Sequence, residues 1–72
     1  MKAKSQVELT PRELEVVQLI CLEYTASEIA AQLGISPRTV EAHKWNIMQK
    51  IRAKSSIGIF KFALKNGIFK LD

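Results

Sequence analysis

The chain has 72 residues and a formal net charge of +4, and it is 47% hydrophobic and 25% charged. This composition is typical of a folded domain and excludes a disordered chain, and the length allows one domain with a small core. No apolar stretch approaches the roughly 20 residues of a membrane-spanning helix, and no signal-peptide pattern is present, so the sequence predicts a protein that is not inserted in a membrane.

Charge and cysteine content indicate the cellular setting. The single cysteine, Cys21, excludes an internal disulfide and is typical of a reducing compartment, so we expect a cytoplasmic protein. The charge is uneven: residues 1–34 carry a net −2, whereas residues 35–72 carry +6. A cationic half indicates a polyanionic partner, and nucleic acid and an acidic membrane surface are the two candidates.

A capping motif predicts the start of the first helix. Residues 1–8 show no hydrophobic periodicity and predict a flexible tail or the end of an interdomain linker. The stretch TPRE, from Thr10 to Glu13, is a capping box with proline at the first helical position. Apolar residues at helical spacing follow, so a helix is predicted over about 11–23.

The middle of the chain predicts a helix-turn-helix. A second capping box, TASE, opens a short helix over about 26–33, and Gly34 ends it in a left-handed conformation. Only Ile35 separates this glycine from the next helix cap, Ser36, which starts a longer helix over 37–51. Two helices joined so closely must cross at a steep angle, as they do in helix-turn-helix proteins.

The fourth predicted helix, over about 56–66, is apolar on nearly every side. One set of residues is predicted to cover the core: Ile57, Phe60 and Leu64. A second set is predicted to point elsewhere and to form a twofold dimer interface: Ile59, Phe62 and Ala63. The alternative is that Phe62 packs against the tail residues Ile68 and Phe69. The predicted fold class is therefore an all-α four-helix bundle over residues 9–72 that contains a helix-turn-helix.

The third helix is predicted to have two faces of different chemistry. Val40, His43, Ile47 and Ile51 cluster on one side at about 100° per residue and are expected to face the core. The opposite side carries Trp45 beside basic residues, and an exposed tryptophan indicates a contact surface. An ordinary solvated face is the alternative, but a major groove of B-DNA admits one such helix, so we favour DNA contact.

Four motifs in register with this plan resemble the LuxR/FixJ/GerE-type (NarL-type) DNA-binding domain over about residues 9–70. They are LTPRELEVVQLI, TASEIAAQLGIS, TVEAHKWNIMQKI and FALKNGI. The resemblance implies a transcription regulator that binds DNA, most often the output half of a bacterial two-component response regulator or the end of a quorum-sensing receptor. Some members stand alone at about this length.

The resemblance also implies roles for individual residues. The base-reading positions are Arg38, Glu41, Ala42 and Trp45. The phosphate-contacting positions are Ser36, Thr39, Lys44, Lys50 and Ser55. Members often have a basic or small residue at position 41, a glycine at position 52 and an arginine at position 56, where this chain has Glu41, Arg52 and Ser56. A carboxylate at position 41 has two candidate roles: it accepts a hydrogen bond from cytosine N4, or it pairs with Arg38.

The remaining expectations concern catalysis and partners. The chain has no glycine-rich phosphate loop and no nucleophile–base pair, and Cys21 lies on the inward stripe of its helix, so no enzyme is predicted. His43 has only the distant Cys21 as a further ligand, so neither a metal nor a cofactor is expected. The expected partners are double-stranded DNA with paired half-sites, a second copy of the chain, RNA polymerase, and an upstream receiver domain in a longer regulator. The rival hypothesis is a small protein-interaction module that uses Trp45 and the fourth helix.

Overall fold

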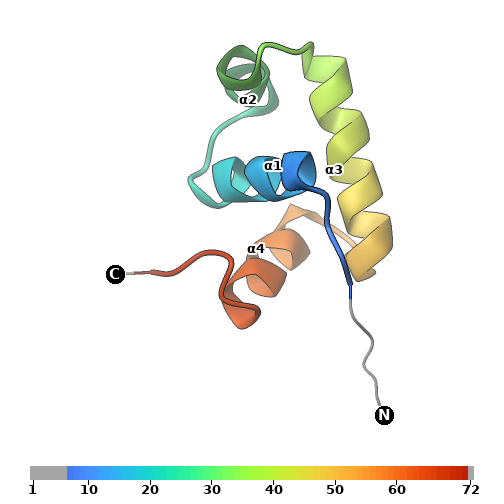
Figure 1. Ribbon diagram of the computed structural model, residues 1–72, viewed down its shortest axis with the longest axis vertical. Helices are drawn as coiled ribbons and strands as arrows, with labels where there is room; N and C mark the ends of the chain where they lie inside the picture. The colour runs from blue at the N-terminus through green and yellow to red at the C-terminus, as the bar shows by residue number, and fades with distance from the viewer. Residues whose placement is uncertain (1–6, 72) are drawn as a thin grey trace.

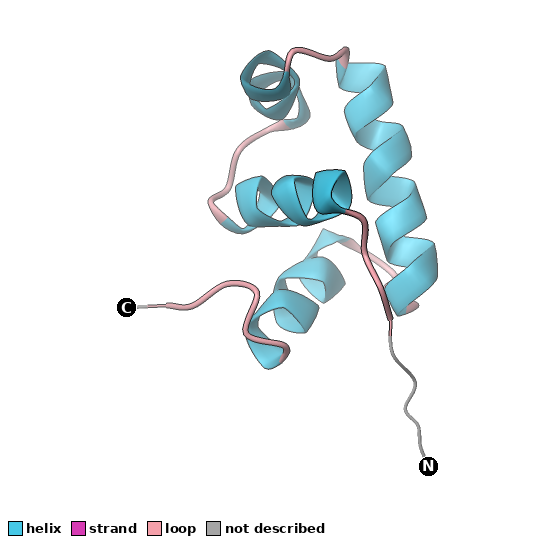
Figure 2. Cartoon of the chain, in the orientation of Figure 1, coloured by secondary structure: helices cyan, strands magenta, loops and turns pink. Residues whose placement is uncertain are grey.

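The computed structural model describes residues 7–71, so most of the predicted tail over residues 1–8 lies outside the described part. The helices are α1 (Pro11–Cys21), α2 (Ala26–Leu33), α3 (Pro37–Ile51) and α4 (Ser56–Lys65) (Figure 1). No strand occurs in residues 7–71 (Figure 2), and the all-α prediction is confirmed. None of these four helices is long and apolar enough to cross a membrane. The long helix α3 runs along one side of the molecule and contacts the other three helices.

Reciprocal side-chain caps start the first two helices. At α1, the Thr10 hydroxyl accepts a hydrogen bond from the Glu13 backbone N–H at 3.1 Å, and the Glu13 carboxylate accepts one from the Thr10 N–H at 2.9 Å. Thr25 and Glu28 form the same pair of bonds at the start of α2, at 3.2 and 2.8 Å. These bonds satisfy donors that a helix start otherwise leaves open, and both predicted capping boxes are confirmed.

Left-handed residues lie at the ends of all four helices. Gly34, at φ 70°, ends α2 as predicted, because glycine adopts this conformation without a steric penalty. The helix α1 ends at Cys21, two residues before the predicted end, because Glu23 has a φ of 68° and cannot continue a right-handed helix. Arg52, at φ 58°, ends α3. The helix α4 ends at Lys65, one residue before the predicted end, and Gly67 follows it at φ 70°.

Two hydrophobic clusters hold the helices together, and α3 contributes to both. The cluster formed by α1, α3 and α4 contains Val16, Val17, Cys21, Ile47, Ile59 and Ala63. The cluster between α2 and α3 contains Ile29, Ala30 and Val40. Val40 and Ile47 on α3 are 1% and 0% exposed, and burial of such side chains contributes about 1.5–3 kcal/mol each. One stripe of α3 is thus fixed in the core, and its opposite side is left to the solvent.

The structure corrects the predicted orientation of α4. Ile59 and Ala63, which were expected at a dimer interface, are both fully buried in the core, so this part of the prediction is wrong. Ile57, which was expected to cover the core, is 67% exposed. The two buried residues are four positions apart and share one face of the helix. Phe62 is half-buried and keeps part of its ring accessible.

The residues after α4 pack against the bundle. The rings of Phe60 and Phe69 lie 6.1 Å apart in a tilted arrangement that is favourable for aromatic pairs. The Gln18 side-chain amide of α1 donates a hydrogen bond to the Ile68 carbonyl at 2.6 Å. These two contacts hold the tail to α1 and α4.

Candidate nucleic-acid interface

The outward side of α3 carries a mixed group of exposed side chains. The four residues that sequence reasoning assigned to base reading, Arg38, Glu41, Ala42 and Trp45, are all exposed. They lie together because the burial of Val40 and Ile47 fixes the rotation of α3 about its axis. Trp45 is 59% exposed, which is a large apolar surface for a lone side chain in water. This side of α3 is suited to contact a partner.

The start of α3 offers hydrogen-bond donors to an anion. The Ser36 side-chain oxygen accepts a hydrogen bond from the Thr39 backbone N–H at 3.1 Å, and the two hydroxyl oxygens lie 2.9 Å apart. Only one of the two hydroxyl protons is used between them, so the other can be donated to a ligand. The first turn of α3 contains no acidic residue, and the positive end of the helix dipole also favours an anion.

Glu41 pairs with Lys44, not with Arg38. The Lys44 Nζ lies 3.7 Å from the Glu41 Oε1, and the two side chains are 28% and 57% exposed. Among the described residues, Arg38 makes no ion pair, so its guanidinium is available to a partner. Ion pairs whose carboxylate is largely exposed contribute at most about 1 kcal/mol. A phosphate can therefore compete with Glu41 for Lys44.

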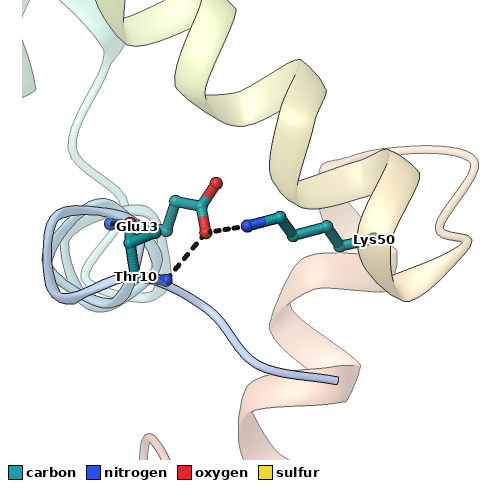
Figure 3. A network of polar contacts seen from close by, with 3 residues as sticks. All are labelled: Thr10, Glu13 and Lys50. Carbon is teal, nitrogen blue, oxygen red and sulfur yellow. Dashed lines mark hydrogen bonds and ion pairs between the residues drawn. The ribbon is translucent and has the colours of Figure 1, made fainter. Parts of the chain in front are cut away.

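Lys50 takes part in a contact that sequence reasoning missed. Its Nζ lies 2.8 Å from Oε1 of Glu13, the capping residue of α1, and that carboxylate is 6% exposed (Figure 3). Burial acts to raise the pKa of Glu13, but hydrogen bonds from Lys50 and Thr10 outweigh it, and the pKa lies below its usual value of 4.5. Glu13 is recognisable from sequence as a capping residue, but no local pattern connects it with a lysine 37 positions away.

The junction of α3 and α4 adds a second polar region. Ser55 is the residue before α4, and its side chain makes no capping hydrogen bond, so its hydroxyl is not committed to the helix. Lys44 of α3 and Ser56 of α4 line the same cavity. The start of α4 thus lies near the middle of α3, and both elements can approach one ligand.

Cys21 and His43 both lie at least partly inside the bundle. The Cys21 thiol is buried, and this burial raises its pKa, so it stays protonated and is a poor nucleophile. His43 is half-buried on α3. Within residues 7–71, no three histidine, cysteine or acidic side chains lie together as metal ligands would.

A short helix, a tight turn at Gly34 and a longer helix with an exposed polar side define a helix-turn-helix protein. The sequence profile of the luxR family of bacterial regulatory proteins (GerE) matches residues 7–63. The chain belongs to this family.

Similar proteins support this assignment at the level of sequence and of structure. The chain is 49% identical over 57 residues to the oxygen regulatory protein NreC of Staphylococcus carnosus, a match that covers 79% of this chain and 26% of that protein. It is 45% identical over 64 residues to the uncharacterized response regulatory protein YgeK of Escherichia coli, covering 89% of this chain and 44% of YgeK. The structure of the transcription factor GerE matches with a TM-score of 0.82 and 36% identity, covering 89% of this chain and 96% of GerE. The chain thus spans less than half the length of the NreC and YgeK proteins.

Proposed function

We propose that this chain binds double-stranded DNA sequence-specifically and regulates transcription, with α3 inserted in the major groove. The observation that carries the proposal is the exposed side of α3, where Arg38 and Trp45 stand beside a helix start that is open to an anion. A major groove about 12 Å wide accepts one helix, and the first turns of that helix reach the base edges. Two of the similar proteins, the transcription factor GerE and the response regulatory protein YgeK, support the same function.

Each base-facing side chain has a chemical counterpart in the groove. Arg38, which is free of ion pairs among the described residues, matches the two acceptors on guanine. Glu41 is an acceptor and matches the amino group of cytosine. Ala42 and Trp45 offer apolar surface to a thymine methyl group. A carboxylate in this set repels phosphates, so it favours a helix that discriminates between sequences over one that binds any duplex.

The phosphate contacts surround this base-reading set. Ser36 and Thr39 offer a hydroxyl proton at the start of α3, and Lys44 offers a charge that an exposed carboxylate holds only weakly. Ser55 extends the contacts to α4. These contacts fix the register of the protein on the duplex without reading its sequence.

Two copies pair through α4 when they occupy adjacent half-sites. Because Ile59 and Ala63 are buried, the outward side of α4 consists of Ile57, Lys61 and Lys65, with Phe62 at its edge. This apolar area is small, and a twofold axis brings like charges together, so pairing depends on DNA. Sedimentation should show a monomer without DNA, and Ile57→Glu should weaken binding to paired half-sites while leaving single half-sites unaffected. A dimer in the absence of DNA contradicts this proposal.

The wider context follows from the relatives. Because the chain matches only 26% of NreC and 44% of YgeK, it corresponds to the output domain of a longer response regulator, in which an upstream receiver domain controls DNA binding. Bound at a promoter in the cytoplasm, it recruits or blocks RNA polymerase. The alternative is a stand-alone regulator whose activity is set by its own concentration. The match to GerE supports this alternative, because the chain covers 96% of that structure.

The test is selection of duplexes from a random pool, followed by titration of the selected sequence. Trp45, the only tryptophan, should report binding through its fluorescence. Affinity should fall with added salt by a log–log slope of about 0.9 per phosphate neutralised. Trp45→Ala should abolish selective binding, whereas Leu22→Ala, which removes an apolar side chain that is 54% exposed at the end of α1, should not. If no duplex binds at low ionic strength, the proposed DNA binding is wrong, and the result favours the rival hypothesis of a protein-interaction module.

A further inference from the structure

We infer that Lys50 is a positioning residue: through Glu13 it sets the angle at which α3 is presented to DNA, and it does not neutralise a DNA phosphate. This inference rests on the proposed binding of α3 to DNA. It reverses the role that the family resemblance implied for Lys50, and the reason is the ion pair of Figure 3.

The environment of Glu13 holds Lys50 in place. One carboxylate oxygen, Oε1, accepts both the Thr10 backbone N–H at 2.9 Å and the Lys50 ammonium at 2.8 Å. The Glu13 residue is 5% exposed, and among the described residues Lys50 is the only cation within ion-pair distance of it. If Lys50 moved to a phosphate, it would leave a buried charge without its partner, and such charges are costly. The Lys44 pair has no such penalty because its carboxylate, Glu41, is 57% exposed, so Lys44 can bind a phosphate and Lys50 cannot.

The ion pair also has a directional role that the apolar contacts of α3 lack. Val40 binds α3 to α2, and Ile47 binds it to α1 and α4, but apolar contacts are not directional. Among the described residues, Lys50–Glu13 is the only side-chain hydrogen bond between α3 and another helix. The ion pair attaches α3 to α1 at a second point, three residues beyond Ile47. Attachment at both points fixes the angle between α3 and α1.

The geometry of α3 amplifies a change at this end. Arg38 lies 12 residues before Lys50, which is about 18 Å along the axis at about 1.5 Å per residue. If α3 tilts by about 5° about its Ile47–Lys50 end and carries α2 with it through Val40, Arg38 moves by about 1.6 Å over that length. Hydrogen bonds to base edges tolerate only a few tenths of an ångström, so such a tilt breaks them. Loss of the ion pair should therefore weaken selective binding although neither residue touches DNA.

Two variants give opposite results under the two roles of Lys50. If Lys50 positions α3, both Lys50→Met and Glu13→Gln should weaken selective binding by about tenfold, within the range for residues that touch neither partner, and leave the salt slope unchanged. If Lys50 contacts a phosphate, Lys50→Met should lower the slope by about 0.9, and Glu13→Gln should strengthen binding by freeing the lysine. Glu13→Gln retains an oxygen for the Thr10 cap, so it removes the charge and keeps the helix start.

The controls separate positioning from simple loss of stability. Affinities are measured at a temperature where circular dichroism shows each variant to be folded; an unchanged affinity under these conditions overturns the inference. Lys50→Arg should restore selective binding because arginine can pair with Glu13, and Lys44→Met should lower the salt slope by about one unit and so validate the assay. If the unaltered chain binds no duplex, the proposed function fails instead.

A measurement on the unaltered protein covers the case in which the variants do not fold. The ¹³C chemical shift of the Glu13 carboxyl group reports its pairing with Lys50 directly. It should stay constant when the selected duplex is added, because the ion pair persists in the complex. A shift toward the value of an unpaired carboxylate on DNA binding means that a phosphate has taken Lys50, and the inference is then wrong.

Discussion

Replacement of Lys50 by methionine should cost the fold about 1–3 kcal/mol. Breaking a fully buried ion pair costs about 3–5 kcal/mol because a charge is left without a partner. The value is smaller here because the Lys50 side chain is 40% exposed and Glu13 keeps its hydrogen bond from Thr10. A 72-residue domain is stabilised by only about 4–11 kcal/mol, so the variant should lose a large share of its stability.

Urea unfolding followed by circular dichroism at 222 nm measures this loss. The double variant Glu13→Gln/Lys50→Met should be more stable than the sum of the two single losses predicts, because removing both partners leaves no unpaired buried charge. The coupling free energy should be about 1–2 kcal/mol. A loss below about 0.5 kcal/mol for Lys50→Met, or additive single losses, would show that the ion pair contributes no more than an ordinary surface pair.

Three further predictions concern the fold. A Cβ atom at Gly58 would lie 2.6 Å from the Ala53 Cβ, so Gly58→Ala should lower the urea midpoint although alanine favours helices by about 1 kcal/mol, and adding Ala53→Gly should restore it. Arg52 has a φ of 58°, so Arg52→Gly should raise the Tm by about 2–8 °C while Arg52→Ala does not. The pKa of Glu13 is lowered in the folded protein, so its contribution to stability is complete above the usual value of 4.5 and is lost as the pH falls through the folded value. Urea midpoints from pH 6 to pH 3 should therefore fall less in Glu13→Gln than in the unaltered chain.

The capping residues in the sequence predicted where the helices begin, because each of them interacts only with residues nearby in the chain. Each capping box joins residues three positions apart, and the left-handed Gly34 needs no distant partner. The end of α1 was placed two residues late because Glu23 adopts a left-handed conformation that is uncommon for glutamate. No short motif marks such a residue, so tertiary packing decides it.

The face of α4 could not be predicted for a different reason. A helix that is apolar on nearly every side has no single hydrophobic stripe, so periodicity allows several rotations about its axis. Packing against α1 and α3 selected the rotation that buries Ile59 and Ala63 and exposes Ile57. The helix α3 has a clear polar side and a clear apolar side, and there the prediction of which residues are exposed is confirmed for Arg38 and Trp45.

The formal charge of residues 35–72 overstates the positive electrostatic field that a DNA duplex meets, because two of the lysines are paired with carboxylates. Residues 35–72 carry a net charge of +6, but Lys44 and Lys50 in this half each lie within 4 Å of a carboxylate. The two pairs differ in strength because Glu41 is largely exposed and Glu13 is buried. An approaching phosphate should therefore draw Lys44 away and leave Lys50 with Glu13. Under the proposed DNA binding, one lysine would then neutralise a backbone phosphate, and the other would hold α3 in place.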